Sequence, residues 1–192
     1  MVTTSPTSQQ ETYTKIPTLK LLLWLAMVSM VMMFAGLTSG YIVRQAESNW
    51  QVFELPSIFY VSTALLLLSS ISIQFAFMGV KKNNFPQLRI GLLVTLGLGL
   101  GFAFTQFMSW SALVQNGIFF TGNPSGSFLY VLTGLHLAHL VGGIIFLMYV
   151  STRSIQGKYT SGNYLPVELC TIFWHFLDGL WLYLFIFLLM TR

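Results

Sequence analysis

The chain has 192 residues, of which 55% are hydrophobic and only 7% are charged, and its formal net charge is +4. A soluble domain of this length carries about 25% charged residues, so this chain lacks the groups needed to cover its surface in water. A soluble enzyme, a disordered chain and a nucleic-acid-binding protein are all poor fits, since the positive charges form no basic stripe. The single cysteine, Cys170, excludes a disulfide framework and a site built from several thiolates. The composition predicts an integral membrane protein.

The first 18 residues are polar and contain Ser, Thr, Gln and two Pro. A secretory signal has a cationic start and a short apolar core of about 7–15 residues. Here the first apolar run starts near Leu19 and continues to about Val43. Residues 1–18 are therefore predicted to form a disordered cytoplasmic tail, followed by a span that is retained.

Five stretches of the chain are long and apolar enough to cross a hydrocarbon core ~30 Å thick, which takes ~20 helical residues. They are residues 19–43, 56–80, 88–113, 127–151 and 169–190. All are too long for strands and their apolar runs do not alternate, which excludes a transmembrane barrel. The predicted fold is all-α, with a membrane domain of five transmembrane helices over residues 19–192 and no soluble domain in the loops.

The orientation follows from the positive charges in the short connections. Those on the side of the N-terminus are Lys15, Lys20, Lys81, Lys82, Arg89, Arg153 and Lys158, whereas the opposite side has Arg44 and Arg192. This asymmetry predicts a cytoplasmic N-terminus and a C-terminus outside. Tyr41, Trp50 and Trp110 fall near the predicted outer boundary, where amphipathic rings favour the headgroup layer.

Small residues predict where helices approach one another closely, because lipid supplies no hydrophobic drive between them. They are Gly36 and Gly40 in the first span, Gly97, Gly99 and Gly101 in the third, and Gly142 and Gly143 in the fourth. Two interpretations remain open at this point: tight packing within this bundle, and docking on another membrane subunit.

Ionisable side chains at mid-bilayer cost about 2.5–3.5 kcal/mol each, so each one requires an explanation. The first three spans carry none at depth. The last two contain His136 and His139 in the fourth span, and His175 and Asp178 in the fifth, with Glu168 at its cytoplasmic end. At ~100° per residue, the residues of each span fall on one helix face. The sequence therefore predicts two polar stripes on consecutive, antiparallel helices.

We expect these two stripes to face each other. Counted from the outer ends of their helices, His139 and Asp178 each lie about 12 residues in, at a depth of roughly 18 Å. An imidazole beside a carboxylate helps to satisfy both groups. The sequence thus predicts a direct or water-bridged contact between His139 and Asp178.

Three functions compete for these residues. A haem or metal site needs two or more convergent ligands, for which His139 with His175 is the only plausible pair. A proton relay could use Glu168, His175 and Asp178, but no ionisable group continues it through the first three spans. The interpretation we favour is a structural polar network of His136, His139, Glu168, His175 and Asp178, with no metal and no catalytic residue.

Two motifs in the last two spans carry a family resemblance. The fourth contains Thr133-Gly-Leu-His136-Leu-Ala-His139-Leu-Val-Gly-Gly143 and the fifth contains Glu168-Leu-Cys-Thr-Ile-Phe-Trp174-His175-Phe-Leu-Asp178-Gly-Leu-Trp181. They resemble the T-G-x-H-x-x-H-x-x-x-G and E-x-x-x-x-x-W-H-F-x-D-x-x-W stretches of cytochrome c oxidase subunit III. Weaker matches at Phe34-Ala-Gly-Leu37 and Ser125-Gly-Ser-Phe128 extend the likeness over nearly the whole chain.

The resemblance implies the short, five-helix bacterial form of an accessory subunit of a haem-copper oxidase in the inner membrane. That complex reduces oxygen with electrons from cytochrome c and couples the reaction to proton translocation. The resemblance places haem and copper in subunits I and II, with none bound by this chain. It implies packing on subunit I, contact with subunit II and small subunits, and phospholipid in a cleft between a two-helix group (first two spans) and a three-helix group (last three spans).

One departure from the family pattern concerns a buried acidic residue. The family has a glutamate in its first shared helix, in a pattern like S-E-x-M-x-F, and this chain has Met30 there. The third span likewise has Trp110 in a segment that begins at Gln106 and lacks the glutamate of the family's Q-x-S-E-Y stretch. Any role in proton uptake that depends on the first of these carboxylates is in doubt for this chain.

Other complexes and other classes of protein compete with this interpretation. The nearest alternatives are subunit III of a quinol oxidase and the companion subunit of a nitric oxide reductase. An alternative from another class is a stand-alone transporter or metal-binding membrane protein that uses His136 and His139. The electron donor, the haem type and membership of a larger respiratory assembly are properties of other chains.

Overall fold

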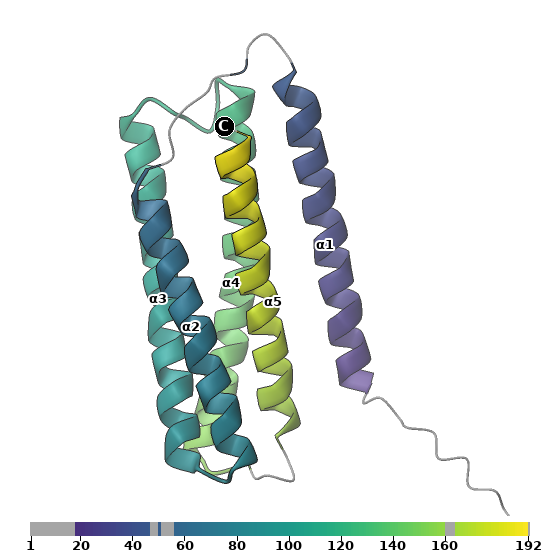
Figure 1. Cartoon of the computed structure of the whole chain (residues 1–192), viewed down its shortest axis with the longest axis vertical. Coiled ribbons are helices and arrows are strands. Elements are labelled where there is room, and N and C mark those ends of the chain that lie inside the picture. The colour runs from purple at the N-terminus through teal and green to yellow at the C-terminus, as the bar shows by residue number, and fades with distance from the viewer. Residues whose placement is uncertain (1–17, 47–49, 51–55, 160–163, 192) are drawn as a thin grey trace, which may run out of the picture.

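The protein folds into five long helices that run up and down in turn (Figure 1). The computed structural model describes residues 18–46, 50, 56–159 and 164–191. The helices are α1 (Thr18–Gln45), α2 (Ile58–Lys81), α3 (Phe85–Gln115), α4 (Pro124–Ile155) and α5 (Leu165–Met190). Each is long and apolar enough to cross a membrane, which confirms the predicted all-α fold of five spans. Most of the predicted tail, together with Lys15 and Arg192, lies outside the described residues.

Capping residues set where two of the helices begin. The side chain of Asn84 accepts a hydrogen bond from the backbone N–H of Gln87 at the start of α3, and Asn123 accepts one from Ser125 at the start of α4. A proline follows each cap within the first turn, where its missing N–H does no harm. Both helices therefore begin before the predicted spans, because hydropathy marks the hydrocarbon core and not the cap.

Helices α2 and α3 form a close antiparallel hairpin. A Cβ atom placed on Gly91 would lie 2.7 Å from the Cβ of Ala76 and 2.9 Å from its backbone, so only glycine permits this approach. The hydroxyl of Ser72 donates to the carbonyl of Gly91 across the same contact, at 3.0 Å. The turn between the helices contains Asn83 at a φ of 54°, a left-handed conformation that asparagine tolerates.

Helices α2 to α5 form a four-helix bundle, and α1 stands beside it (Figure 1). Within the described residues, α1 contacts α4 and α5 but neither α2 nor α3. The division into a two-helix and a three-helix group, implied by the resemblance, is therefore wrong for this chain. The physical reason is that a helix packs on the helices whose surfaces fit its own, and these need not be its neighbours in the sequence. Only a narrow stripe of α1 is buried, formed by Met27, Phe34, Thr38 and Tyr41.

Three polar contacts fix α1 parallel to α5. Lys20 Nζ lies 2.7 Å from Glu168 Oε1, Thr38 Oγ1 lies 2.9 Å from Tyr183 Oη, and Gln45 Nε2 donates to the Thr191 carbonyl at 2.7 Å. The paired residues are separated by 148, 145 and 146 positions in the sequence. A nearly constant separation means that the two helices run in the same direction and in one register along their whole length.

The predicted packing glycines fall into three groups. Gly99 and Gly143 are in tight contact with α5, since a Cβ would lie 2.8 Å from Trp174 at the first position and 3.0 Å from Leu177 at the second. Gly40 and Gly101 have ordinary van der Waals neighbours at 3.7 Å. The positions with no neighbour within 4 Å are Gly36, Gly97 and Gly142. Packing within the bundle therefore explains the first group, whereas docking on another subunit remains a prediction for the last.

We predict that Gly91→Ala destabilises the bundle by about 1–3 kcal/mol, because the added methyl group overlaps Ala76 and forces α2 and α3 apart. The matched control is Gly97→Ala on the same helix, where nothing lies within 4 Å. The control should be neutral or slightly stabilising, since alanine favours helix over glycine. Thermal unfolding of the purified protein measures both, and equal midpoints for the two variants would contradict the prediction.

Candidate functional site

The histidine at position 136 lies in the interior of the four-helix bundle. His136 is 0% exposed, and its ring packs on Phe102 of α3 and Trp181 of α5 at centroid distances of 5.9 and 4.9 Å. Neither ring nitrogen has a hydrogen-bond partner among the described residues. Aromatic side chains therefore enclose this imidazole, and no carboxylate pairs with it.

The second histidine of α4, His139, contacts helix α1. Nδ1 of His139 lies 2.7 Å from the carbonyl oxygen of Leu135, one turn back on the same helix. The ring makes an edge contact with Phe34 of α1, at a centroid distance of 6.0 Å. This imidazole is half-buried at the seam between α4 and α1.

The polar residues of α5 also face separate helices. Glu168 forms the ion pair with Lys20 of α1. His175 contacts α2, with Nδ1 2.6 Å from Ser70 Oγ and Nε2 3.2 Å from Gln74 Oε1. An amide oxygen only accepts, so Nε2 is the donor to Gln74, and in the neutral ring Nδ1 then accepts from the Ser70 hydroxyl.

Asp178 is 4% exposed, and both of its carboxylate oxygens lack a hydrogen-bond partner among the described residues. The direct form of the predicted contact between His139 and Asp178 is therefore wrong, whereas its water-bridged form stays a prediction. The depth of each residue was estimated from its own helix, but the contact depends on how each helix is rotated. Helix α4 meets α5 through Gly143 and His136, which turns His139 toward α1.

No hydrogen bond joins any two of the five predicted residues, within the part of the chain that the structure describes. The proposed relay of Glu168, His175 and Asp178 is not linked by direct hydrogen bonds. In the candidate ligand pair, His139 packs on Phe34 of α1, whereas His175 contacts Ser70 of α2 and also lines the groove beside Phe34. The described residues also contain no cluster of three or more His, Cys, Asp or Glu side chains that could hold a metal ion.

Two tryptophans of α5 make hydrogen bonds that the sequence analysis missed. The indole N–H of Trp174 donates to Ser69 at 2.9 Å, and that of Trp181 donates to Thr63 at 3.0 Å. All four side chains are buried. The available signal was the spacing of the tryptophans: they are seven residues apart, two helical turns, which places both on one face of α5.

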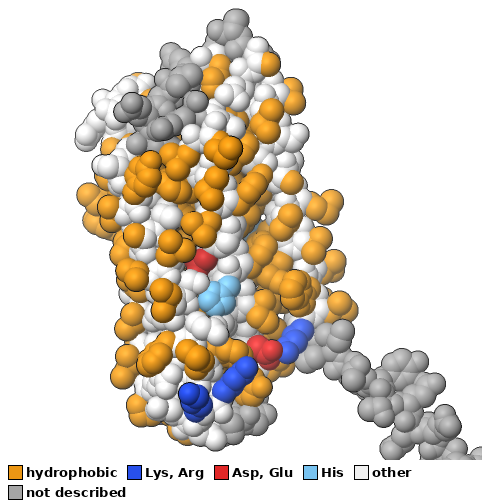
Figure 2. Space-filling view, viewed as in Figure 1, with side chains coloured by type: hydrophobic (Ala, Val, Ile, Leu, Met, Phe, Trp, Pro, Cys, Tyr) orange, Lys and Arg blue, Asp and Glu red, His pale blue; other side chains and the backbone are white. Residues whose placement is uncertain are grey.

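A groove of about 490 Å³ lies between α1 and α5. Its lining consists of Val31, Phe34, Ala35, His175, Phe176, Gly179, Leu180 and Tyr183. Nothing lies within 4 Å of the position of a Cβ on Gly179. The groove is mostly apolar, with one imidazole at its wall, and Figure 2 shows hydrophobic side chains over most of this face of the molecule.

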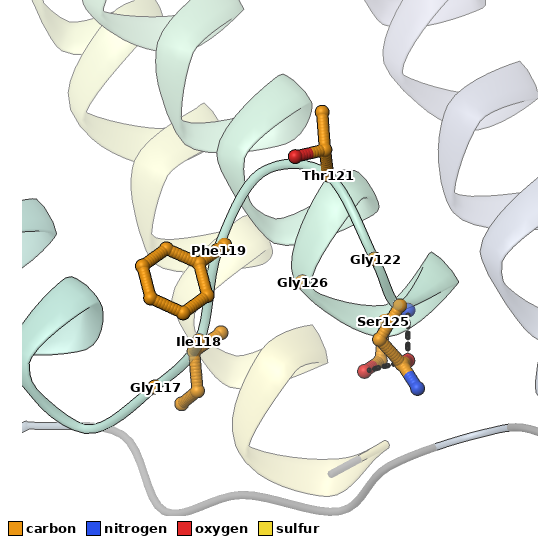
Figure 3. A pocket seen from close by; sticks show the side chains of 8 residues that line it. Gly117, Ile118, Phe119, Thr121, Gly122, Ser125 and Gly126 are labelled. Atoms are coloured by element: carbon orange, nitrogen blue, oxygen red, sulfur yellow. Dashed lines mark hydrogen bonds between the residues drawn. The ribbon is translucent and has the colours of Figure 1, made fainter.

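A smaller cavity of about 200 Å³ lies in the turn between α3 and α4 (Figure 3). Its polar groups are already engaged: Asn123 accepts from the backbone N–H and the hydroxyl of Ser125, at 2.9 and 2.7 Å. A Cβ on Gly126 would lie 2.9 Å from the carbonyl oxygen of Phe119. This cavity belongs to the structure that starts α4, and we assign it no ligand.

The fold and these contacts define a multi-pass helical membrane protein whose intramembrane polar groups connect neighbouring helices. Comparison with known proteins identifies the family. The family Cytochrome c oxidase subunit III matches residues 7–191. The chain belongs to this family, as the two motifs predicted.

Curated relatives agree with this assignment. The probable cytochrome c oxidase subunit 3 of Nocardia farcinica is 32% identical over 169 residues, covering 85% of this chain and 82% of that protein. Cytochrome c oxidase subunit 3 of Bacillus sp. (strain PS3) is 26% identical, covering 84% and 80%. Cytochrome c oxidase subunit 3 of the hagfish Myxine glutinosa is 32% identical over 134 residues, which are 70% of this chain and 49% of that protein.

We predict that Ser69→Ala destabilises the protein by about 1–2 kcal/mol, because it leaves the buried N–H of Trp174 without an acceptor. Ser62→Ala is the matched control: Ser62 is equally buried on α2, but its hydroxyl bonds only to the carbonyl of Phe59 in its own helix. Thermal unfolding followed by tryptophan fluorescence measures both. A control that loses as much stability as Ser69→Ala would contradict the prediction.

A second prediction concerns the ion pair between α1 and α5. Lys20→Met and Glu168→Gln should each lower stability by roughly 0.5–1 kcal/mol, since each leaves a charge unpaired near the membrane boundary. The exchanged pair, Lys20→Glu with Glu168→Lys, should recover most of the loss because it keeps the attraction. The midpoint of thermal unfolding tests this, and an exchanged pair less stable than either single variant would exclude an ion-pair contribution.

Proposed function

We propose that the chain is the accessory, non-redox subunit III of an aerobic haem-copper oxidase of the cytochrome c oxidase type. The observation that carries this proposal is the family match over residues 7–191. A second supporting observation is that each intramembrane histidine has a neighbour on another helix: His136 packs on Phe102, His139 packs on Phe34, and His175 contacts Ser70. In this proposal the polar residues stabilise helix contacts, and none of them is catalytic.

The haem and copper centres are proposed to belong to subunits I and II, with which this chain packs. Within α1, large apolar side chains point outward, including Leu21, Leu25, Val28 and Met32, each more than half exposed. A membrane-spanning helix with so few buried residues must be covered by lipid or by protein. This outward face is consistent with an assembly in which a larger subunit and lipid surround the chain, and in which the chain supports oxygen reduction coupled to proton translocation.

Phospholipid is proposed to occupy the groove between α1 and α5. The apolar lining and the volume of about 490 Å³ suit part of an acyl chain. This position replaces the cleft that the resemblance placed between the first two and the last three spans, since α1 alone stands apart from the bundle.

The N-terminus is proposed to lie in the cytoplasm and the C-terminus outside, in the cytoplasmic (inner) membrane of a bacterium. Among the described residues, the basic side chains at the end that holds the start of α1 are Lys20, Lys81, Lys82, Arg89, Arg153 and Lys158, and Arg44 lies at the other end. Figure 2 shows Lys and Arg side chains gathered near one end of the visible face. Such an excess marks the cytoplasmic side.

The alternatives are less well supported. The relatives are named as cytochrome c oxidase subunits, and not as subunits of a quinol oxidase or a nitric oxide reductase. The transporter or metal-binding alternative required His136 and His139 to act together, but His136 faces α3 and α5 while His139 faces α1.

Purification through a tag on this chain, in mild detergent, tests the proposal. We expect it to recover larger membrane subunits, a haem spectrum and copper, including a copper-bearing subunit II. Copper in subunit II distinguishes a cytochrome c oxidase from a quinol oxidase. The matched control is the Gly91→Ala variant, which should recover less haem per chain because its bundle is destabilised. Recovery of the intact, folded chain without any haem-bearing partner would overturn the proposal.

A further inference from the structure

Two buried polar side chains face the interior of the bundle without a partner. Gln106 on α3 and His136 on α4 are both 0% exposed. All four of their polar side-chain atoms lack a hydrogen-bond partner: Nε2 and Oε1 of Gln106, and Nδ1 and Nε2 of His136. No hydrogen-bond partner for any of these four atoms lies among the described residues.

The contacts between α3 and α4 place these two residues at the same depth. The indole N–H of Trp110 on α3 donates to Thr133 on α4 at 3.1 Å, and Phe102 on α3 packs on His136 itself. Gln106 lies one helical turn from both Phe102 and Trp110, and the two helices are antiparallel. It therefore stands opposite the turn of α4 that runs from Thr133 to His136.

The neighbouring polar groups are already engaged. The hydroxyl of Thr133 accepts from Trp110 and donates to the carbonyl of Leu129. The N–H of Trp181, whose ring packs on His136, donates to Thr63. The amide of Gln106 has two N–H donors and an acceptor oxygen, and an imidazole always carries at least one N–H donor. Lipid and aromatic rings supply no ordinary partner for these groups.

We propose that a water molecule binds between Gln106 and His136, in the interior of the bundle formed by α2 to α5. Water can both donate and accept, and buried waters characteristically join two to four polar groups that have no other partner. The bound water links the buried stripes of α3 and α4 at mid-depth. The site differs from the lipid groove, which lies on the other side of α5 against α1.

A high-resolution electron cryo-microscopy map of the protein, purified with whatever subunits accompany it, tests the site directly. We expect one density peak within hydrogen-bond distance of both the Gln106 amide and a ring nitrogen of His136. The peak should disappear in Gln106→Leu and persist in Ser109→Ala, whose hydroxyl bonds only to Thr105 in its own helix. No peak in the parent protein, or a direct hydrogen bond between the two side chains, overturns the proposal.

Unfolding rates provide a second test that does not need a map. Gln106→Leu and His136→Phe should each raise the rate of thermal unfolding by about tenfold, because each leaves the other side chain and the water incompletely paired. The double variant removes all the polar groups together, so it should unfold no faster than either single variant. A double variant that unfolds faster than both single variants overturns the proposal.

Discussion

Lipid offers neither hydrogen bonds to a polar side chain nor a hydrophobic drive between helices, and this constraint governs how the bundle is held together. Glycines let neighbouring helices approach closely: Gly91 of α3 packs on Ala76 of α2, and Gly143 of α4 packs on Leu177 of α5. Specific pairing is supplied by hydroxyls of α2 that accept the indole N–H groups of α5. Each of these contacts joins two helices, so these side chains determine which helices lie next to each other.

Helix α1 is held to the bundle in a different way from the other four helices. It buries one narrow stripe and relies on polar contacts near both ends and in its C-terminal half, and the contact of Lys20 with Glu168 is an ion pair. Such a helix keeps most of its apolar surface for lipid or for a neighbouring subunit. A mostly apolar groove of about 490 Å³ lies between this helix and α5.

The candidate site shows where reasoning from the sequence stops. Helical spacing placed His136 and His139 on one broad face, yet an arc of ~60° is wide enough for the two rings to contact different helices. Depth placed His139 level with Asp178, but level residues meet only if both helices are rotated toward each other. Asp178, Gln106 and His136 have no hydrogen-bond partner for their side chains among the described residues. Hydrogen-bond partners for these side chains depend on water or on other chains. The periodicity of a helix carries no information about either of them.

Composition and hydropathy alone determined that this is a membrane protein with five spans, because the length of an apolar run must match the thickness of the bilayer. Two motifs in the last two spans were enough to indicate the family. Only the tertiary structure decided that α1 stands outside a four-helix bundle, that His139 faces α1 and His175 faces α2, and that Ser69 and Thr63 hold the tryptophans of α5. The reason is that lipid treats all apolar helix faces alike, so the choice of neighbour comes from side-chain shape and hydrogen bonds between residues far apart in the sequence.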